Sequence, residues 1–249
     1  MARHRFYASP DEFDGSSIDL STEETHHLAH VLRARLGDEL FVFDGCGREF
    51  RARFIEAGKR ARLEVIEALT NEVESPLRLT LAQALAKGDK FDLVVQKATE
   101  LGVSRIVPLM TDNADVKLTA VQAAKRLDRW RRISLEALKQ CGRRMLVEIV
   151  DVASLESLLN ASPRDGLVLV LSERGGVPVT ESIAGLRGAS GVSVLVGPEG
   201  GWSDRELASM RERRCISVSL GGRILRTETA AIVAVALLQH VVGDLSKPY

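Results

Sequence analysis

The sequence predicts an α/β protein in two parts: a parallel sheet covered by helices on both faces and, before it, a smaller, mostly β unit. From residue 77 onward, short apolar runs alternate with segments of helical spacing. Strands that are apolar almost throughout are typical of a parallel sheet buried on both faces. The first 70 or so residues instead show short alternating strands around glycines, which favours hairpins. We predict domains at 1–72 and 73–249, joined by a polar linker at 71–76.

The elements of the first part follow from local patterns. Ser21 and Glu24 form a capping-box pattern, which predicts a short helix that runs to Leu32. Apolar and polar residues alternate over 39–44, 49–54 and 61–69, which predicts strands there. Gly45 and Gly47 separate the first two strands and indicate a hairpin.

The elements of the second part follow from a change of period along the chain. Apolar runs predict strands at 77–85, 106–110, 167–171, 192–196 and 216–220. Helical spacing predicts helices at 91–101, 119–141, 204–213 and 228–242, and Gly102 suits the end of the first of these. Strands and helices therefore alternate, as a parallel sheet requires.

The charge of the chain is balanced overall but uneven along it. The 249 residues contain 34 Lys and Arg against 34 Asp and Glu, so the whole protein is not strongly basic. Residues 1–72 carry a net charge of −4, whereas residues 117–147 hold nine basic residues against two acids. The stretch from Arg48 to Arg62 holds six basic residues against two acids. Such patches, rather than the total, are what a polyanion meets.

Several classes of protein are disfavoured by composition. The chain has no run of 18 apolar residues and no apolar stretch after its basic first residues, so we expect neither a transmembrane helix nor a secretory signal. Cys46, Cys141 and Cys215 are odd in number and far apart, which disfavours disulfides and a structural zinc site. Aromatic residues make up only 4%, too few for base-stacking platforms. We expect a cytoplasmic protein with reduced thiols.

Two glycine-bearing loops follow predicted strands and mark where a ligand would bind. Residues 197–203 read Gly-Pro-Glu-Gly-Gly-Trp-Ser, and residues 221–229 read Gly-Gly-Arg-Ile-Leu-Arg-Thr-Glu-Thr. Ligands in open α/β sheets bind beyond the carboxyl ends of the strands, and glycine lets the backbone approach them closely. Neither loop matches a dinucleotide or P-loop pattern. Ordinary strand-to-helix turns can look the same, but two such loops favour a ligand cleft.

These two loops resemble the paired signature of the RsmE family, the ribosomal RNA small-subunit uridine N3-methyltransferases of the SPOUT class. Three further stretches resemble the same family in the expected order: Ala86–Gly102, Gln140–Arg143 and His27–Arg33. The resemblance implies a small PUA-like β-barrel that helps to hold RNA, followed by a SPOUT-type parallel sheet with a deep trefoil knot. General rules of topology would have rejected the knot. It also implies a homodimer whose site lies near the subunit interface.

The activity implied by the resemblance is methylation of the N3 position of a uridine in 16S ribosomal RNA, with S-adenosyl-L-methionine as methyl donor. The donor would contact the two loops and the end of strand 167–171. The implied cofactor residues are Leu171, Val196, Gly197, Pro198, Glu199, Gly200, Gly201, Leu220, Gly221, Ile224, Leu225, Arg226, Thr229 and Ala230. The substrate is either naked RNA or an assembled small ribosomal subunit.

The predicted RNA contacts come from basic residues. We predict them for Arg33, Lys87, Lys97, Arg129, Arg132 and Arg143. The excess of one sign on the helix 125–132 favours phosphate contact, although a solvated helix face has the same pattern.

Methylation at N3 needs an unstacked base, in-line alignment with the donor and loss of the imide proton. Arg226 and Glu228 are the candidate catalytic residues: Glu228 could act as base, and Arg226 could stabilise the uracil anion. Glu228 could instead simply favour the dipole of the helix that begins there.

Other reactive side chains have plainer interpretations. His26 and His30 lie one helical turn apart, but without a third ligand they favour a surface role, and we predict no metal. Cys141 falls on the apolar side of its helix and is predicted to be a buried thiol. Trp202 could stack on adenine or cap its loop.

Two positions depart from the family pattern. Asn113 stands where the family often has Arg, and Lys139 where it often has Glu. We expect both on the RNA side, away from the methyl donor.

Two other functions stay open: a SPOUT methyltransferase that acts on transfer RNA, and a catalytically silent RNA-binding factor for ribosome assembly. The presence of Gly197, Glu199, Gly200, Arg226 and Glu228 argues against the silent factor.

Overall fold

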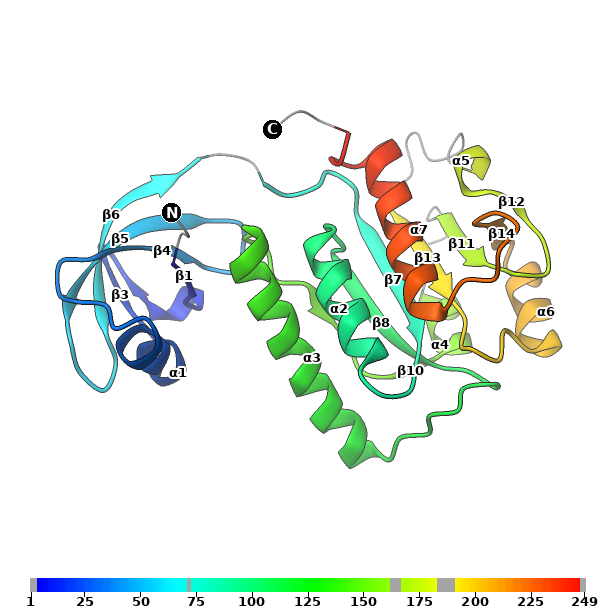
Figure 1. The fold of residues 1–249 in the computed structure, drawn as a ribbon, viewed down its shortest axis with the longest axis horizontal. Helices are drawn as coiled ribbons and strands as arrows, with labels where there is room; N and C mark the ends of the chain where they lie inside the picture. Colours follow the sequence, from blue (N-terminus) through cyan, green and yellow to red (C-terminus); the bar gives the residue numbers. More distant parts are fainter. Residues whose placement is uncertain (1–3, 71–72, 162–166, 183–190, 247–249) are drawn as a thin grey trace. The chain divides into compact units, whose positions relative to one another are not determined.

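The computed structural model describes residues 4–70, 73–161, 167–182 and 191–246 (Figure 1). The chain forms two compact units. Unit 1 consists of residues 1–74 together with 138–146, and unit 2 of residues 75–137 and 147–249. The segment 138–146 therefore belongs to unit 1, although it follows the start of the second part by more than sixty residues. Residues 71–72 of the predicted linker lie outside the described residues.

Unit 1 contains a six-stranded sheet in the order β1-β4-β5-β6-β3-β2. The strands are β1 (Arg5–Tyr7), β2 (Phe13–Asp14), β3 (Ser17–Asp19), β4 (Glu39–Phe43), β5 (Glu49–Glu56) and β6 (Arg62–Leu69). All described pairs are antiparallel except β1 with β4. Irregularities in the register between β5 and β6 bend this sheet, as β-bulges do. The three longer strands are confirmed; β1 to β3 are too short to give an alternating pattern.

The helix predicted in unit 1 is divided into an α-helical and a π-helical part. After the 3-10 turn η1 (Pro10–Glu12), α1 spans Thr22–His26, and the Ser21 hydroxyl accepts a hydrogen bond from the Glu24 amide at 3.1 Å. The chain then continues as a π-helical turn, η2 (His27–Val31), in which the Leu32 amide donates to the His27 carbonyl. The helix start predicted from the capping residue is confirmed. The π-helical turn that follows could not be predicted, because it does not change the spacing of the apolar residues.

Unit 2 contains an eight-stranded sheet in which every described pair is parallel. The order is β10-β8-β7-β13-β11-β14-β12, and β9 also pairs with β8. The strands are β7 (Leu79–Ala84), β8 (Arg105–Met110), β9 (Glu148–Ile149), β10 (Ala153–Ser154), β11 (Leu167–Leu171), β12 (Val177–Pro178), β13 (Val192–Val196) and β14 (Ile216–Ser219). The parallel sheet predicted from the apolar runs is confirmed.

Helices cover both faces of this sheet (Figure 1). They are α2 (Lys90–Glu100), α3 (Ala120–Cys141), α4 (Leu155–Ala161), α5 (Val179–Ser182), α6 (Asp204–Glu212) and α7 (Thr227–Val242). Residues of α2, α3 and α7 share one apolar core with Leu81, whereas α4 and α6 share another with Ala82. Adjacent strand residues point to opposite faces, so each face has its own core. In the described part of the chain, no helix is long and apolar enough to cross a membrane.

The strand order brings the two glycine loops together. β13 lies between β7 and β11, and β14 lies on the other side of β11. Because the strands are parallel, the loops that follow β11, β13 and β14 meet at one edge of the sheet. The predicted knot concerns the path of the chain between these strands, and residues 183–190 of that path lie outside the described residues, so the knot stays a prediction.

Candidate functional site

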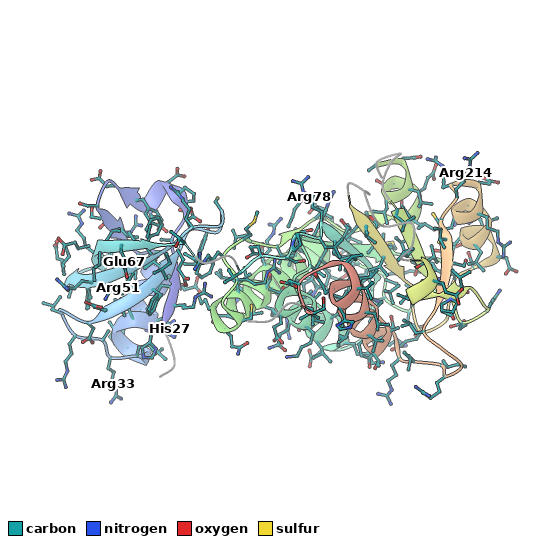
Figure 2. The ribbon with its side chains drawn as sticks, turned by 90° about the horizontal axis from the view of Figure 1, so that it is seen from above. His27, Arg33, Arg51, Glu67, Arg78 and Arg214 are labelled. Carbon is teal, nitrogen blue, oxygen red and sulfur yellow. The ribbon has the colours of Figure 1, made fainter. Side chains whose placement is uncertain are left out.

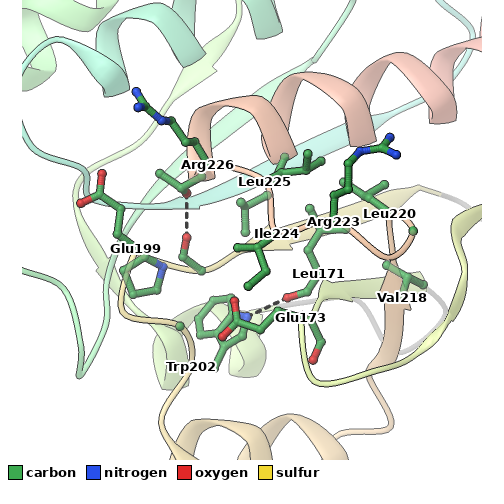
Figure 3. A pocket seen from close by; sticks show the side chains of 18 of the residues that line it. Leu171, Glu173, Glu199, Trp202, Val218, Leu220, Arg223, Ile224, Leu225 and Arg226 are labelled. Carbon is green, nitrogen blue, oxygen red and sulfur yellow. Dashed lines mark hydrogen bonds between the residues drawn. The ribbon is translucent and has the colours of Figure 1, made fainter.

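A cavity of about 510 Å³ lies where the loops after β11, β13 and β14 meet (Figure 3). Its volume is in the range of cavities that hold small organic ligands, roughly 300–1,000 Å³. Twelve of the fourteen predicted cofactor residues line it: Leu171, Val196, Gly197, Pro198, Glu199, Gly201, Leu220, Gly221, Ile224, Leu225, Arg226 and Ala230. The two predicted residues that do not line it are Gly200 and Thr229.

Seven residues that we did not predict as cofactor contacts also line the cavity: Lys90, Ser172, Glu173, Trp202, Val218, Arg223 and Thr227. Four of them lie within or beside the two glycine loops, so the motif could have indicated them. Lys90 begins α2, more than a hundred residues before the first glycine loop. Only the fold brings Lys90 to this edge of the sheet.

The loop after β13 needs glycine at two positions of the cavity wall. A Cβ at Gly197 would lie 3.1 Å from the indole of Trp202, tighter than ordinary contact. Gly201 has φ +70°, and a Cβ there would lie 2.6 Å from a carboxylate oxygen of Glu173. The Gly201 amide also donates to the Pro198 carbonyl at 2.9 Å, which closes a tight turn. The glycines therefore allow close packing and a left-handed backbone, as expected.

Trp202 caps its loop. Its indole Nε1 donates a hydrogen bond to the Leu171 carbonyl at 3.0 Å, and the residue is only 5% exposed (Figure 3). The indole therefore ties the loop after β13 to the end of β11 and forms part of the cavity wall. The structure shows the contact that caps the loop, and stacking of Trp202 on adenine stays a prediction.

The loop after β14 is anchored where α7 begins. The Thr227 hydroxyl donates to the Gly197 carbonyl at 2.7 Å and accepts from the Gln83 side-chain amide at 2.9 Å. Gln83 is fully buried at the end of β7. Arg226 precedes Thr227 with an extended backbone, and its exposed side chain forms no ion pair with a described residue. The arrangement places a free guanidinium at the lip of the cavity (Figure 3).

The charged groups around the cavity are distributed unevenly. Lys90 forms an ion pair with Glu199. Among the described residues, neither Glu173 nor Arg223 has an ion-pair partner. Glu199, Arg226, Glu173 and Trp202 all line the cavity (Figure 3). The cavity therefore offers cations to an anionic group and a separate carboxylate to a hydroxyl or a cation.

Glu228 lies beside the cavity but does not line it. The residue is 9% exposed in the first turn of α7, and its Oε2 atom has no hydrogen-bond partner in the described structure. A catalytic role for Glu228 stays a prediction. Of the two predicted catalytic residues, only Arg226 faces the cavity.

The residues predicted to contact RNA differ in whether their charges already have an ion-pair partner. Arg129 pairs with Asp92 at 2.5 Å, Lys87 with Asp115 at 2.8 Å, and Lys97 with Glu100 at 2.9 Å. Lys87 and Arg129 are exposed and Lys97 is partly exposed, and surface pairs are weak enough to exchange for phosphate contacts. Arg132 and Arg33 are exposed and have no ion-pair partner among the described residues. Arg33 lies at the end of the helical segment of unit 1 with φ 54° (Figure 2).

Three cations of the segment 138–146 are buried inside unit 1. Arg143 pairs with Glu74 at 2.8 Å, Arg144 pairs with Glu49 at 2.9 Å, and Lys139 pairs with Glu24. All three side chains are less than 10% exposed. The RNA contact predicted for Arg143 is therefore not supported by its position. The position expected for Lys139 on the RNA side is likewise not supported, because its side chain is buried against Glu24.

The basic run from Arg48 to Arg62 is neutralised across the strands. Arg51 on β5 pairs with Glu39 on β4 at 2.7 Å and with Glu67 on β6 at 2.9 Å (Figure 2). Arg62 pairs with Asp19 on β3 at 2.8 Å. The acids come from other parts of unit 1, so the excess of charge seen along the sequence largely disappears in the fold.

Asn113 corrects one expectation. We expected this departure to lie away from the methyl donor. Instead, its side-chain amide donates to the Gly201 carbonyl at 3.1 Å, in the loop that lines the cavity. No local pattern could predict this contact, because 88 residues separate the two positions.

The remaining candidates have simple environments. The rings of His26 and His30 lie 4.6 Å apart between centroids. Within the described ranges, no group of three or more His, Cys, Asp or Glu side chains is arranged to hold a metal ion. Cys141 is only half-buried, and its thiol donates to the Leu138 carbonyl at 3.8 Å. Burial raises the pKa of the half-buried Cys215 thiol.

Comparison with known families gives the class of the protein first. The model of an RNA methyltransferase domain matches residues 73–239, and the model of an RNA methyltransferase PUA domain matches residues 20–66. Both units therefore correspond to parts of RNA methyltransferases, and the curled sheet of unit 1 is PUA-like.

Individual relatives give the particular family. The chain is 30% identical over 233 residues to ribosomal RNA small subunit methyltransferase E of Bacillus subtilis, covering 91% of each chain. It is 31% identical to the protein of that name in Mycobacterium tuberculosis, covering 94% of this chain and 90% of the relative. This chain belongs to the ribosomal RNA small subunit methyltransferase E family.

Solved structures agree with this assignment. The enzyme of that name from Neisseria gonorrhoeae, bound to S-adenosyl methionine, has a TM-score of 0.88 and 35% identity, covering 98% of this chain and 99% of that one. A putative methyltransferase from Legionella pneumophila in complex with the same cofactor also has a TM-score of 0.88, with 34% identity over 98% of this chain and all of that one. The SPOUT-type fold predicted for unit 2 is confirmed.

Proposed function

We propose that this protein transfers a methyl group from S-adenosyl-L-methionine to the N3 atom of a uridine in 16S ribosomal RNA. The observation that carries the proposal is the cavity at the ends of β11, β13 and β14, which collects twelve of the fourteen residues that we expected to contact the donor. Membership of a family of ribosomal RNA methyltransferases, with relatives solved in complex with S-adenosyl methionine, supports the donor and the type of substrate.

The residues present fit this cofactor. Leu171, Val218, Leu220, Ile224 and Leu225 offer an apolar wall to the adenine, and Glu173 is a carboxylate that suits hydroxyl groups. The ion pair of Lys90 with Glu199 offers both signs of charge, which suits the zwitterionic amino-acid group. The cofactor supplies an activated methyl group.

The chain contributes mainly alignment and charge. Methyl transfer between two bound groups is accelerated chiefly by holding them in line. The uracil becomes anionic as its N3 proton leaves, and the free guanidinium of Arg226 at the cavity lip is placed to stabilise that charge. The target base must be unstacked to reach a cavity between loops. Glu228, with its unpartnered carboxylate oxygen, is the proposed acceptor of the proton.

The substrate would be held by exposed cations of both units. Arg33 in unit 1 and Arg132 in unit 2 are free to meet phosphates, and Lys87, Lys97 and Arg129 can exchange their surface partners for them.

We also propose that the protein works as a homodimer in the cytoplasm. Ile224 lies at the cavity lip and is 87% exposed, which suits contact with a second copy of the chain. Light scattering after gel filtration tests this, and a mass of one chain of 27.2 kDa at micromolar concentration would contradict it.

The central experiment has two stages. Calorimetry first measures binding of S-adenosyl-L-methionine, and no binding would remove both enzyme functions and leave the silent RNA-binding factor. The protein is then incubated with labelled donor and either small ribosomal subunits, naked 16S RNA or transfer RNA. Mass spectrometry of the nucleosides is expected to show N3-methyluridine in the ribosomal RNA. Label found only in transfer RNA would favour the alternative substrate.

A further inference from the structure

The segment that follows β8 lies against the loop that follows β13. The side-chain amide of Asn113 donates to the Gly201 carbonyl at 3.1 Å and reaches the Gly200 carbonyl at 3.4 Å. A Cβ at Gly200 would lie 3.2 Å from both the Cβ and the carbonyl oxygen of Asn113. Gly200, which does not line the cavity, is therefore in close contact with Asn113.

The neighbouring residue, Asp112, holds the far end of the same loop. Its carboxylate accepts from the Ser203 hydroxyl at 2.6 Å and from Arg205 at 2.5 Å. Its backbone amide donates to Glu206 at 3.0 Å, and Glu206 also accepts from the Ser203 amide at 2.9 Å. The capping box at the start of α6 is thus shared with the segment after β8.

Asn is well suited to the position that it occupies. Its NH₂ group has two hydrogens and can serve two neighbouring carbonyls, which an aspartate of the same shape cannot do. The carbonyls of Gly200 and Gly201 are thus contacted by a residue that does not itself line the cavity. Gly197, Pro198, Glu199 and Gly201 of the same loop line the cavity.

We propose that Asn113 is a positioning residue for the methyl donor, an inference that rests on the proposed function. Asn113 fixes the peptide units of Gly200 and Gly201 before the donor arrives. The loop therefore loses less conformational freedom when the donor binds, and the free-energy cost of binding is smaller. Asn113 does not line the cavity, so it acts through the loop.

The first test is donor affinity by calorimetry. Asn113→Ala is expected to weaken binding of S-adenosyl-L-methionine about five- to tenfold, the effect of losing one or two hydrogen bonds. Asn113→Asp is expected to weaken it more, since a carboxylate would face two carbonyl oxygens. Asp115→Asn is the matched control, because Asp115 lies two residues further on, is exposed and contacts Lys87 rather than the loop. It is expected to leave the affinity within twofold of wild type.

The second test separates positioning from a general structural role. With saturating donor, Asn113→Ala is expected to keep most of its kcat while its KM for the donor rises. Gly200→Ala is also expected to weaken donor binding, and its combination with Asn113→Ala is expected to be less than additive, since both act at one contact.

The outcomes distinguish the two proposals. Failure of the wild-type protein to bind the donor would remove the proposed function and this inference together. Normal binding by the wild type with an unchanged affinity in Asn113→Ala would overturn the inference alone. A variant whose melting temperature falls while its donor affinity and KM stay unchanged would show that Asn113 serves only stability, and would also overturn it.

Discussion

Single side chains at the cavity divide the work between holding the donor and acting on the substrate. Gly197, Gly201 and Trp202 shape the wall, because the indole packs on one glycine and donates to the Leu171 carbonyl. Arg226 stands apart from this packing, with an exposed guanidinium and no described ion-pair partner. Substitutions in the two groups should therefore affect different quantities.

Replacement of Arg226 should affect turnover far more than RNA affinity. Arg226→Ala removes the cation proposed to stabilise the uracil anion, and loss of one such group typically lowers kcat by about a hundredfold or more. Single-turnover methylation assays, together with RNA binding measured by filter retention, check this. Equal losses of turnover and RNA affinity would reassign Arg226 to holding RNA.

Replacement of Gly197 should affect donor binding. A Cβ there would press on the Trp202 indole at 3.1 Å, so Gly197→Ala should displace the ring and weaken donor binding about tenfold, as overpacking by one methyl group does. Gly222→Ala is the matched control, because a Cβ at that position has nothing within 4 Å and its φ is not left-handed. Calorimetry measures both, and similar affinities in the two variants would contradict the role given to Gly197.

At the scale of elements, charged groups join the segment after β8 to the start of α6. The guanidinium of Arg205, helped by the Ser203 hydroxyl, lowers the pKa of the Asp112 carboxyl. A lowered folded-state pKa means that this carboxylate stabilises the fold at pH values above the ordinary Asp pKa, and that the stabilisation is lost as pH falls through the lowered value.

The pH dependence of stability should therefore reveal Asp112. The difference in melting temperature between the wild type and Asp112→Asn should be constant from about pH 5 to pH 8 and shrink below about pH 4. The difference should be small, because Asp112 is an exposed group and solvent screens its ion pair. Scanning calorimetry across this range is the measurement. A difference that grows on acidification would contradict the assigned sign.

The prediction for RNA binding concerns the exposed face of α3. Replacing Arg129 and Arg132 together by Ala should weaken RNA binding and lower the steepness of its dependence on salt by about one unit for each lost phosphate contact. Arg105→Ala is the control, because Arg105 is exposed at the amino end of β8, the opposite end of that strand from the cavity edge. An unchanged salt dependence in the double variant would mean that this face is only solvated.

At the scale of the whole molecule, the net charge of zero results from two different arrangements of the charged side chains, one in each unit. In unit 1, Arg51 and Arg62 are matched by acids on neighbouring strands, and Arg143 and Arg144 are buried with Glu74 and Glu49. In unit 2, exposed cations of α2 and α3 keep weaker, solvent-accessible partners or none. The basic character that matters for RNA is therefore smaller and more local than the linear sequence indicated.

The fold was largely predictable because its signals are local. The period of the apolar residues located the long strands and helices of both units, and Ser21 marked the start of α1. Strands of two or three residues, such as β2 and β12, were missed because they are too short to show a period. The widened turn at His27–Val31 was missed because it leaves the apolar spacing unchanged.

The sequence by itself determined the α/β class, the parallel sheet, the two glycine loops and most of the residues that line the cavity. Only the tertiary structure decided that Lys90 and Glu173 join that cavity, that Asn113 holds its loop, and that Arg143 is buried. The physical reason is the separation along the chain over which each kind of interaction acts. Periodicity and turn chemistry act between neighbours along the chain, whereas an ion pair or a hydrogen bond joins groups that meet only when the sheet and its helices are assembled.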